Sequence, residues 1–434
     1  MSEYFEIAYA ALNNRLCLFT GTGFSKAISD NKAPTWQGLL EGLCVDNHGL
    51  EEVRTSLFPS SGRNPLSLEE AAQVIAIELL KQEKKIHQEI AARISSITLD
   101  KDIDEIRGFC ESHRFKVVTT NYDKLMEQLC GTADCQSLTP GLPIPRSSAR
   151  VRVYHVHGSV DVPENMVVTA DDYFKFLNSE SYFSRKLSTV LHENTVVILG
   201  YSLGDTNLKA ILSEYNGFAR NHVIASNIFL VSRGTVDRPL KDYYSNCYGI
   251  RVIDETTISD FFSGVTQEIP SAKECIDTSV GNVRKVVLEG RRFSESYLRL
   301  EDSFYEIVSS ISAIGLSIDH SGVVKMFGDI IQRKSDLTKE SGAWEQYTHF
   351  AHWLIYLGTI LNVKATSIEN IYLEAVKRSM ETMSKEQLFG YSWQSYKAWR
   401  AKWDSITPAN RSLIASYLTI HSRGKDALSI ISLG

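Results

Sequence analysis

Residues 119–123, Thr-Thr-Asn-Tyr-Asp, follow an apolar run and carry two side chains suited to ligand chemistry. An asparagine offers both a donor and an acceptor, so Asn121 suits a ribose hydroxyl or a positioned water. Asp123 can accept a hydrogen bond from a carboxamide. The structural alternative is an Asx-type turn that leads into a helix over 124–129, and the segment alone does not decide between the two.

Two histidines, His155 and His157, stand at the end of another apolar run, residues 151–156. Residues two apart on a strand point to the same side, which suggests a metal site. No third ligand of a suitable type matches them, so we predict no metal. We expect one histidine to act as a general base, since imidazole titrates near neutral pH, and the other to support it. For His155, a satisfied core histidine is the favoured interpretation.

The segment Gly21-Thr22-Gly23-Phe24-Ser25 follows the apolar run 16–20. A glycine turn lets backbone N–H groups approach a pyrophosphate, and the start of a helix adds a favourable dipole. Ser25 can cap the helix or donate to a ligand. We therefore expect substitution of Gly23 to weaken ligand binding more than stability. A tight turn with a capped helix is the structural alternative.

A second glycine-bearing segment, residues 200–207, follows the most apolar run of the sequence, residues 195–200. Its small residues permit close approach of a ligand, and Gly200 and Ser202 are the candidates for that contact. The structural alternative is a strand–turn–helix junction with Asp205 or Asn207 as the N-cap.

The elements that must position these segments are short apolar runs separated by helical patterns. The runs are residues 16–20, 115–120, 151–156, 195–200, 228–231 and 250–253. Such runs suit a parallel sheet covered on both faces, so we predict an α/β fold with a doubly wound, Rossmann-like sheet. Ser67 and Glu70 form a capping-box pattern before a helix over 71–80. The polar segments then meet at the carboxyl edge of the sheet.

The pattern becomes mainly helical after Ile269-Pro270, and residues 281–434 contain five of the six tryptophans. We predict two domains: residues 1–280 for ligand binding and catalysis, and residues 281–434 for assembly or regulation. The aromatic cluster over 391–403 has two interpretations. It is either core packing within the helical domain or a contact surface for another copy or a partner.

Composition excludes several classes of protein. The formal net charge of -6 argues against direct nucleic-acid binding by the chain as a whole. The seven cysteines are scattered without a Cys-x-x-Cys pair, which argues against a disulfide framework and a structural zinc site. The N-terminus lacks a basic signal-peptide region, and the longest apolar stretch, Trp353–Val363, is too short to span a bilayer. We expect a cytoplasmic protein without membrane contact.

Taken in order, the four segments resemble the sirtuin family, and more closely the bacterial sirtuin-like domains of antiphage defence, over about residues 10–255. Residues 21–25 are similar to the Gly-Ala-Gly-x-Ser phosphate loop, residues 120–123 to Gln-Asn-Ile-Asp, residues 157–158 to the catalytic His-Gly, and residues 200–202 to Gly-x-Ser. The resemblance implies a sirtuin-type fold in which Asn121 and His157 are the catalytic pair and Asp123 faces the nicotinamide amide. It also implies NAD binding by Gly21, Thr22, Gly23, Ser25, Gly200 and Ser202.

Two departures from the family narrow what this resemblance implies. No zinc-binding cysteines lie between His157 and Gly200, and Ala33-Pro34-Thr35-Trp36 replaces the Pro-Asp-Phe-Arg loop. The combination resembles zinc-free enzymes that hydrolyse NAD, as substrate, to nicotinamide and ADP-ribose and so deplete it in antiphage defence. A zinc-free deacylase or ADP-ribosyltransferase, or a non-enzymatic module that senses NAD or ADP-ribose, are the alternatives.

Chain size and organisation also resemble the sirtuin-like partner of a HerA-type hexameric ATPase. That resemblance implies a homo-oligomer with such an ATPase as its partner.

Overall fold

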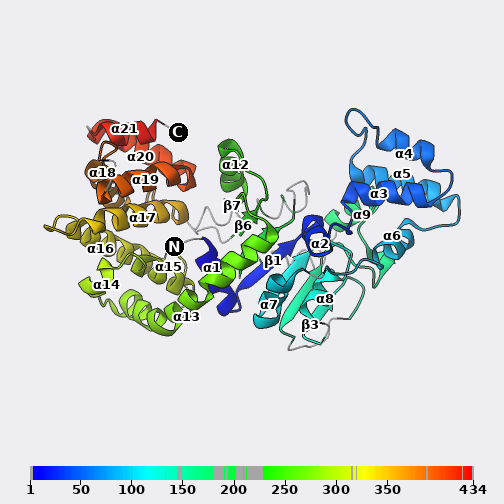
Figure 1. Cartoon of the computed structure of the whole chain (residues 1–434), viewed down its shortest axis with the longest axis horizontal. Helices are drawn as coiled ribbons and strands as arrows, with labels where there is room; N and C mark the ends of the chain where they lie inside the picture. Colours follow the sequence, from blue (N-terminus) through cyan, green and yellow to red (C-terminus); the bar gives the residue numbers. More distant parts are fainter. Residues whose placement is uncertain are drawn as a thin grey trace.

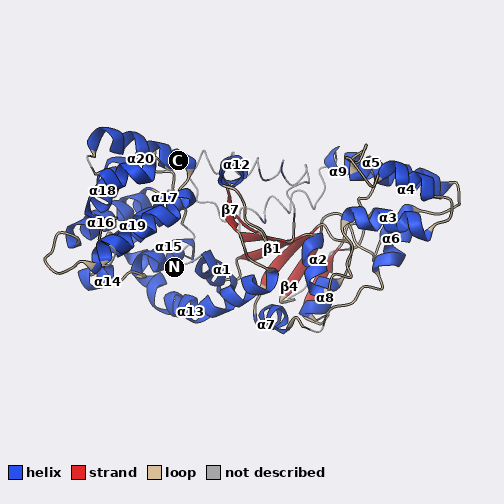
Figure 2. Ribbon diagram, turned by 45° about the horizontal axis from the view of Figure 1, so that its top comes forward, coloured by secondary structure: helices blue, strands red, loops and turns tan. Residues whose placement is uncertain are grey.

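The computed structural model describes residues 3–100, 102–131, 133–143, 149–178, 190, 194–201, 209, 212, 228–313, 316–318, 320–387, 390–422 and 424–432. A parallel β-sheet stands at the centre of the chain, with one group of helices beyond each of its ends (Figure 1). Figure 2 shows the strands as one sheet between these two helical groups.

The sheet contains seven strands in the described part of the chain, and all of their pairings are parallel. Their order is β3-β4-β2-β1-β5-β6-β7. The strands are β1 (Leu16–Thr20), β2 (Phe115–Thr119), β3 (Cys135–Leu138), β4 (Val151–His155), β5 (Thr195–Leu199), β6 (Ile228–Val231) and β7 (Ile250–Ile253). All six predicted strands are present. β3 was not predicted, because Cys-Gln-Ser-Leu is too short and too polar to stand out as an apolar run.

Both faces of the sheet are buried because consecutive residues of each strand point to opposite sides. In β1, Leu16 and Leu18 pack with one hydrophobic cluster, whereas Cys17 and Phe19 pack with another. The first face is covered by α1 (Glu3–Leu12), α7 (Asp104–Ser112), α8 (Leu125–Cys130) and the first half of α13 (Ile258–Glu289). The second face packs against α12 (Arg238–Tyr248) among other residues. These observations confirm the doubly wound α/β fold.

The carboxyl ends of the four central strands lie in one row. Thr20 is paired with Thr119 on one side and Leu199 on the other, and Thr119 is paired with His155. The strand order also reverses beside β1, where open α/β sheets place their ligands. This register confirms that the predicted segments after β1, β2 and β4 meet at one edge of the sheet, together with Gly200 after β5.

A lobe of four helices, here called the cap lobe, is inserted between α2 (Thr22–Ile28) and α7. It comprises α3 (Trp36–Asp46), α4 (Glu51–Leu57), α5 (Leu68–Leu80) and α6 (Ile86–Ile94). The predicted capping box is confirmed at α5, where Ser67 Oγ accepts from Glu70 N and Glu70 accepts from Ser67 N. The lobe has a hydrophobic core of its own, which also includes Tyr122 from the sheet edge. α5 packs on α9 (Ala170–Asn178), which follows the short helix η1 (Pro163–Asn165).

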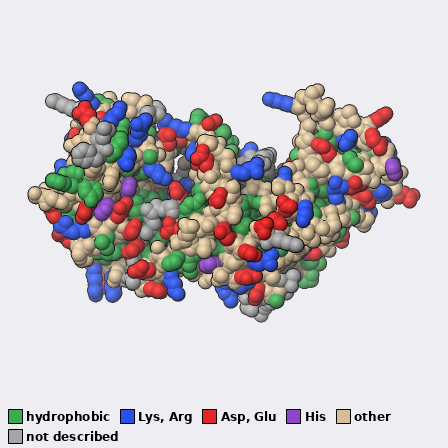
Figure 3. Space-filling view, in the orientation of Figure 1, with side chains coloured by type: hydrophobic (Ala, Val, Ile, Leu, Met, Phe, Trp, Pro, Cys, Tyr) green, Lys and Arg blue, Asp and Glu red, His purple; other side chains and the backbone are tan. Residues whose placement is uncertain are grey.

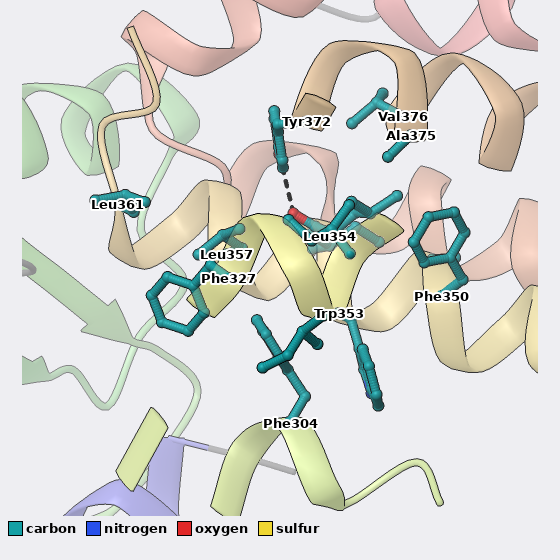
Figure 4. Close-up of a cluster of buried hydrophobic side chains, with 14 of the residues drawn as sticks. Phe304, Phe327, Phe350, Trp353, Leu354, Leu357, Leu361, Tyr372, Ala375 and Val376 are labelled. Atoms are coloured by element: carbon teal, nitrogen blue, oxygen red, sulfur yellow. Dashed lines mark hydrogen bonds between the residues drawn. The ribbon is translucent and has the colours of Figure 1, made fainter. Parts of the chain in front are cut away.

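The C-terminal part of the chain is helical, as predicted. Its elements are α14 (Glu295–Arg299), α15 (Ser303–Ala313), α16 (Ser321–Leu337), α17 (Glu345–Ile360), α18 (Glu369–Thr382), α19 (Tyr391–Lys402), η2 (Trp403–Ser405), α20 (Pro408–His421) and α21 (Lys425–Ile431). Figure 4 shows its core, in which Trp353 and Phe304 stack and the Tyr372 hydroxyl donates to the Leu354 carbonyl at 2.9 Å. No helix within the described residues is long and apolar enough to cross a membrane.

The predicted boundary at residue 280 lies inside the continuous helix α13. The first half of α13 contributes Phe261 and Phe262 to the core beneath the sheet, and its second half contributes Val283 to the core of the C-terminal helices. A chain cut at residue 280 therefore loses the last nine of the 32 residues of a helix that both parts share.

Three of the five aromatic residues over 391–403 are core residues. Tyr396, Trp399 and Trp403 are buried, Trp393 is half-buried against the core, and Tyr391 is exposed. Core packing therefore explains most of this cluster. Among the described residues of the helical part, Trp344 is the most exposed aromatic residue, at 62%.

The close packing around Gly23 leads to a first testable prediction, which concerns stability. A Cβ at this position would lie 2.7 Å from the carbonyl oxygen and 2.9 Å from the Cα of Gly200, and both are backbone atoms. We expect Gly23→Ala to lower the free energy of unfolding by about 1–3 kcal/mol, the usual range for overpacking. Gly23 thus has a packing role, so its substitution should lower stability as well as the predicted ligand binding.

Denaturant unfolding measures this effect, and Gly108→Ala is the matched control. Gly108 lies in α7, and a Cβ there would meet nothing within 4 Å. This control should gain up to about 1 kcal/mol from helix propensity. Equal unfolding free energies for Gly23→Ala and the parent protein would contradict the packing role.

Candidate active site

A cavity of about 320 Å³ opens where the carboxyl edge of the sheet meets the cap lobe. Its wall contains five of the nine predicted site residues: Thr22, Ser25, Asn121, Asp123 and His157. The other wall residues are Ala33, Pro34, Thr35, Trp36, Leu39, Leu68, Glu69, Ile94, Ile97, Thr120, Tyr122, Tyr173 and Tyr201. The structure thus brings both predicted catalytic residues into the wall of one cavity.

Asn121 lies just beyond β2 and is held by hydrogen bonds at its backbone and side chain. Its backbone N–H donates to Thr119 Oγ1 at 3.1 Å. Its side-chain nitrogen donates to the Gly21 carbonyl at 2.9 Å and to Ser25 Oγ at 2.7 Å. These bonds join the segment after β2 to the segment after β1, so the two predicted sites form one unit.

The side-chain oxygen of Asn121 has no hydrogen-bond partner among the described residues, although it is buried. The amide cannot be turned over, because the carbonyl oxygen of Gly21 requires a donor opposite it. Buried acceptors without a partner are rare and call for an explanation such as a catalytic role or a bound ligand. A hydroxyl group or water that enters the cavity can supply the missing donor.

Asp123 serves both the fold and the site. Its Oδ1 accepts from the backbone N–H of Leu125 at 3.1 Å, which confirms the Asx-type turn, and its Oδ2 accepts from Ser25 Oγ at 2.8 Å. Burial raises the pKa of this carboxyl, and the two hydrogen bonds offset only part of that effect. Ser25 is therefore an oriented relay, because it accepts from Asn121 and donates to Asp123.

His157 follows β4 and is 4% exposed. The rings of Tyr173 and Phe176 meet it edge-on, each with a centroid distance of 5.4 Å. The next residue, Gly158, has a φ of +83°, and a Cβ there would lie 2.7 Å from the Asn165 carbonyl oxygen. The chain therefore needs a glycine to turn sharply after the histidine.

Both aromatic residues on His157 belong to α9, whose N-terminal end is held by Asp172. Its Oδ2 accepts from Thr169 N at 2.9 Å and lies 2.9 Å from Nε2 of His87 in α6. Burial raises the pKa of Asp172, but the hydrogen bonds from His87 and Thr169 outweigh it and lower the pKa to about 2. A charged carboxylate thus ties the aromatic wall of the cavity to the cap lobe.

His155 is the core histidine that the sequence favoured. It is completely buried, with Nδ1 at 3.0 Å from the Asn121 carbonyl oxygen and Nε2 at 2.8 Å from Glu127 Oε1. It is absent from the cavity wall, so the two histidines have different environments.

The glycines lie beneath the cavity and act through backbone packing. Gly21 N donates to the Leu199 carbonyl at 3.1 Å, and Gly23 N donates to the Gly200 carbonyl at 2.8 Å. Gly200 has a φ of +61°, and a Cβ there would meet the backbone nitrogen of Phe24 at 2.0 Å. Ser202, Asp205 and Asn207 lie outside the described residues.

Sequence reasoning missed the part of the wall that comes from the cap lobe and α9. Trp36 packs edge-on against Tyr122 with a centroid distance of 6.0 Å, and its indole nitrogen is buried without a partner in the described part of the chain. The available signal was the Ala33-Pro34-Thr35-Trp36 loop, which departs from the sirtuin pattern and lies entirely in the wall. Tyr173 and Glu69 gave no sequence signal, whereas Tyr201 belongs to the predicted segment 200–207.

Charges outside the cavity are mixed rather than segregated. Figure 3 shows acidic and basic side chains interspersed over the face that it displays. Among the described residues, no group of three or more histidine, cysteine or acidic side chains could hold a metal ion, and all seven cysteines are free.

The fold and the cavity define an open α/β protein whose ligand site lies at the carboxyl edge of a parallel sheet. Residues 116–253 match the model of the SIR2-like domain, a range that includes Asn121, Asp123 and His157. This part of the chain is thus similar to SIR2-like domains.

Curated relatives agree with this family. The chain is 23% identical to defense-associated sirtuin 2 of Bacillus subtilis over 264 residues, which are 59% of this chain and 24% of that protein. It is 28% identical to the NAD(+) hydrolase ThsA of Enterococcus faecium over 239 residues, 48% of this chain and 50% of the relative. It is also 28% identical to the ThsA of Bacillus cereus strain MSX-D12 over 167 residues, 34% of this chain and 35% of the relative. The chain thus spans half or less of the length of these relatives.

Proposed function

We propose that the chain is an NAD hydrolase, which cleaves the nicotinamide–ribose bond to give nicotinamide and ADP-ribose. The observation that carries this proposal is the buried, unpartnered Oδ1 of Asn121 in a cavity wall that also contains His157. The names of the ThsA relatives, NAD(+) hydrolases, support the same substrate and reaction.

The chemistry follows from the charges of the substrate. Departure of nicotinamide from NAD⁺ breaks the C–N bond and leaves positive charge on the ribose, while nicotinamide leaves as a neutral molecule. Water adds its oxygen to the ribose C1 and gives up one proton. Overall, NAD⁺ and water yield nicotinamide, ADP-ribose and a proton, so the protein has to position the water and accept that proton.

The residues of the cavity suit these tasks. Asn121 Oδ1 can accept from a ribose hydroxyl or from the attacking water and so align it with the ribose. His157 can take the proton, since a neutral imidazole is a competent base near pH 7. Asp123, Ser25 and Thr22 line the same space, and we assign Asp123 to the nicotinamide amide.

Incubation of the purified full chain with NAD, in the presence of a strong chelator, tests this function. We expect nicotinamide and ADP-ribose to form in equal amounts without a peptide, because water is the acceptor and no zinc takes part. Release of nicotinamide only with an acylated peptide would instead establish the deacylase or transferase alternative. Tight NAD binding without any product, under all conditions, would establish a sensing module.

We also propose a biological setting and an assembly for the enzyme. The printed name of the Bacillus subtilis relative, a defense-associated sirtuin, supports a role in antiphage defence, in which the enzyme depletes NAD in the cytoplasm. An unrestrained NAD hydrolase would drain its own cell, so we assign residues 281–434 to assembly as a homo-oligomer and with a HerA-type ATPase. Size measurement of the purified chain, alone and mixed with such an ATPase, tests that assignment.

A further inference from the structure

An ionic chain leads from the protein surface to two buried residues, Glu127 and His155, and ends on the backbone of Asn121. It runs from Asp161 through Lys124 and Glu127 to His155. We propose that Glu127, acting through His155, is a positioning residue that holds the Asn121 peptide so that its side chain faces the substrate. The proposal rests on the proposed NAD hydrolase function and adds a group that does not itself touch the substrate.

His155 connects the chain to the site by two hydrogen bonds, one from each ring nitrogen, to acceptors on Asn121 and Glu127. Nδ1 lies 3.0 Å from the Asn121 carbonyl oxygen, which can only accept, so Nδ1 is the donor. Nε2 lies 2.8 Å from Glu127 Oε1. A second hydrogen bond that fixes the ring is how proteins usually orient a histidine. The Glu127 contact thus decides how the imidazole presents its donor to Asn121.

Glu127 is a charged residue that is buried, with only 6% of its surface exposed. Burial raises the pKa of its carboxyl, but the charges and hydrogen bonds of His155 and Lys124 outweigh that effect and lower the pKa to about 2. Lys124 Nζ lies 2.7 Å from Glu127 Oε1 and 2.7 Å from Asp161 Oδ2. Glu127 is therefore a carboxylate at neutral pH, held between Lys124 and His155.

A contribution to the stability of the fold does not by itself explain why a charged residue is buried at position 127. Replacement of buried ion pairs by apolar residues of similar size is often neutral or stabilising. The second carboxylate oxygen of Glu127 is also buried without a partner among the described residues, which adds a desolvation cost. A positioning role at the neighbouring Asn121 accounts for a charged residue at this place.

The geometry around Asn121 shows how the hydrogen bond from His155 affects the orientation of the Asn121 side chain. Thr119 Oγ1 accepts from the Asn121 N–H at 3.1 Å, and His155 binds the carbonyl oxygen on the other side of the same residue. With both backbone groups held, the side-chain nitrogen of Asn121 donates to the Gly21 carbonyl and to Ser25 Oγ. The side-chain Oδ1 then stays available to accept from the substrate. Loss of the His155 donor frees the backbone at this point.

Two isosteric substitutions of His155 separate its two contacts. The amide nitrogen of an asparagine side chain occupies nearly the place of Nδ1, whereas that of glutamine occupies nearly the place of Nε2. His155→Asn therefore retains the donor to Asn121, and His155→Gln retains only the donor to Glu127. We expect kcat for nicotinamide release to fall at least about 10-fold further in His155→Gln than in His155→Asn, on the scale of a misplaced catalytic group.

Substitutions of Glu127 test whether this carboxylate itself helps to position Asn121. Glu127→Gln keeps an acceptor for Nε2 and should retain kcat within about 5-fold, whereas Glu127→Leu should lose about 10- to 100-fold in kcat with KM changed much less. Glu6→Gln is the matched control, since Glu6 binds Arg251 through two 2.8 Å contacts and neither residue lines the cavity. It should lower the melting temperature and leave kcat unchanged.

Crystal structures of the Glu127 variants separate this proposal from the proposed function. In Glu127→Leu we expect the Asn121 side chain to leave its contacts with Gly21 and Ser25, and in Glu127→Gln to keep them. An unmoved Asn121 in Glu127→Leu, or equal kcat values for the two Glu127 variants, overturns the positioning role. If the parent protein releases no nicotinamide, the NAD hydrolase function fails, and the structures alone then decide whether Glu127 positions Asn121.

Discussion

We expect Asn121→Ala to lower the rate of nicotinamide release from NAD by about 100-fold or more, the usual scale for losing a key positioning group. The substitution removes the only buried side-chain acceptor in the cavity wall that lacks a partner among the described residues. Without it, neither the ribose hydroxyl nor the attacking water is aligned. Steady-state kinetics with NAD, followed by nicotinamide release, measures the effect.

The same substitution also removes two hydrogen bonds, so its effect on folding has to be measured separately. The Gly21 carbonyl and Ser25 Oγ each lose a donor, which costs about 1–3 kcal/mol for each buried group left unsatisfied. Ser25→Ala is the matched variant, because it removes one of these contacts and leaves Asn121 Oδ1 in place. We expect it to lose less activity. An equal loss of activity in the two variants would mean that the network, rather than Oδ1, matters.

His157→Ala should also lower NAD cleavage by about 100-fold or more, because it removes the general base. The ring lies edge-on to Tyr173 and Phe176, so its loss leaves a small cavity and a moderate loss of stability as well. The loss of activity should therefore be far larger than the accompanying fall in melting temperature can explain. Parallel thermal unfolding and nicotinamide assays distinguish the two effects.

His113→Ala is a control for loss of an aromatically packed histidine. His113 stacks on Phe109 with a centroid distance of 4.5 Å, next to the C-terminal end of α7 and away from the cavity wall. This variant should lose stability and keep its activity. Folded His157→Ala protein with activity near that of the parent would remove His157 from the mechanism.

The sheet and its functional edge could be predicted because both depend on local sequence. Short apolar runs that end at polar or glycine-bearing segments specify buried parallel strands, and the carboxyl ends of such strands meet at one edge. Asn121 and His157 lie in the cavity wall for this reason. The structural alternatives were also partly correct, since Asp123 forms an Asx-type turn and also faces the cavity.

The remainder depends on tertiary packing, which a single sequence does not reveal. The cap lobe encloses the cavity through side chains such as Trp36 and Leu68, whose positions follow from the packing of helices distant in sequence. Glu127 lies 28 residues from His155 and reads in the sequence as an ordinary helix residue. Gly23 appeared to need space for a ligand, but its first neighbour is the Gly200 backbone.

The central claim is that NAD places its nicotinamide ribose between Asn121 and His157. A crystal structure of His157→Ala protein with intact NAD tests it most directly, because this variant should bind the substrate without consuming it. We predict that the nicotinamide ribose lies in the cavity, with Asn121 Oδ1 accepting from a ribose hydroxyl or from a water beside C1. A nicotinamide ribose bound outside this cavity, with Asn121 Oδ1 still without a partner, would contradict the claim.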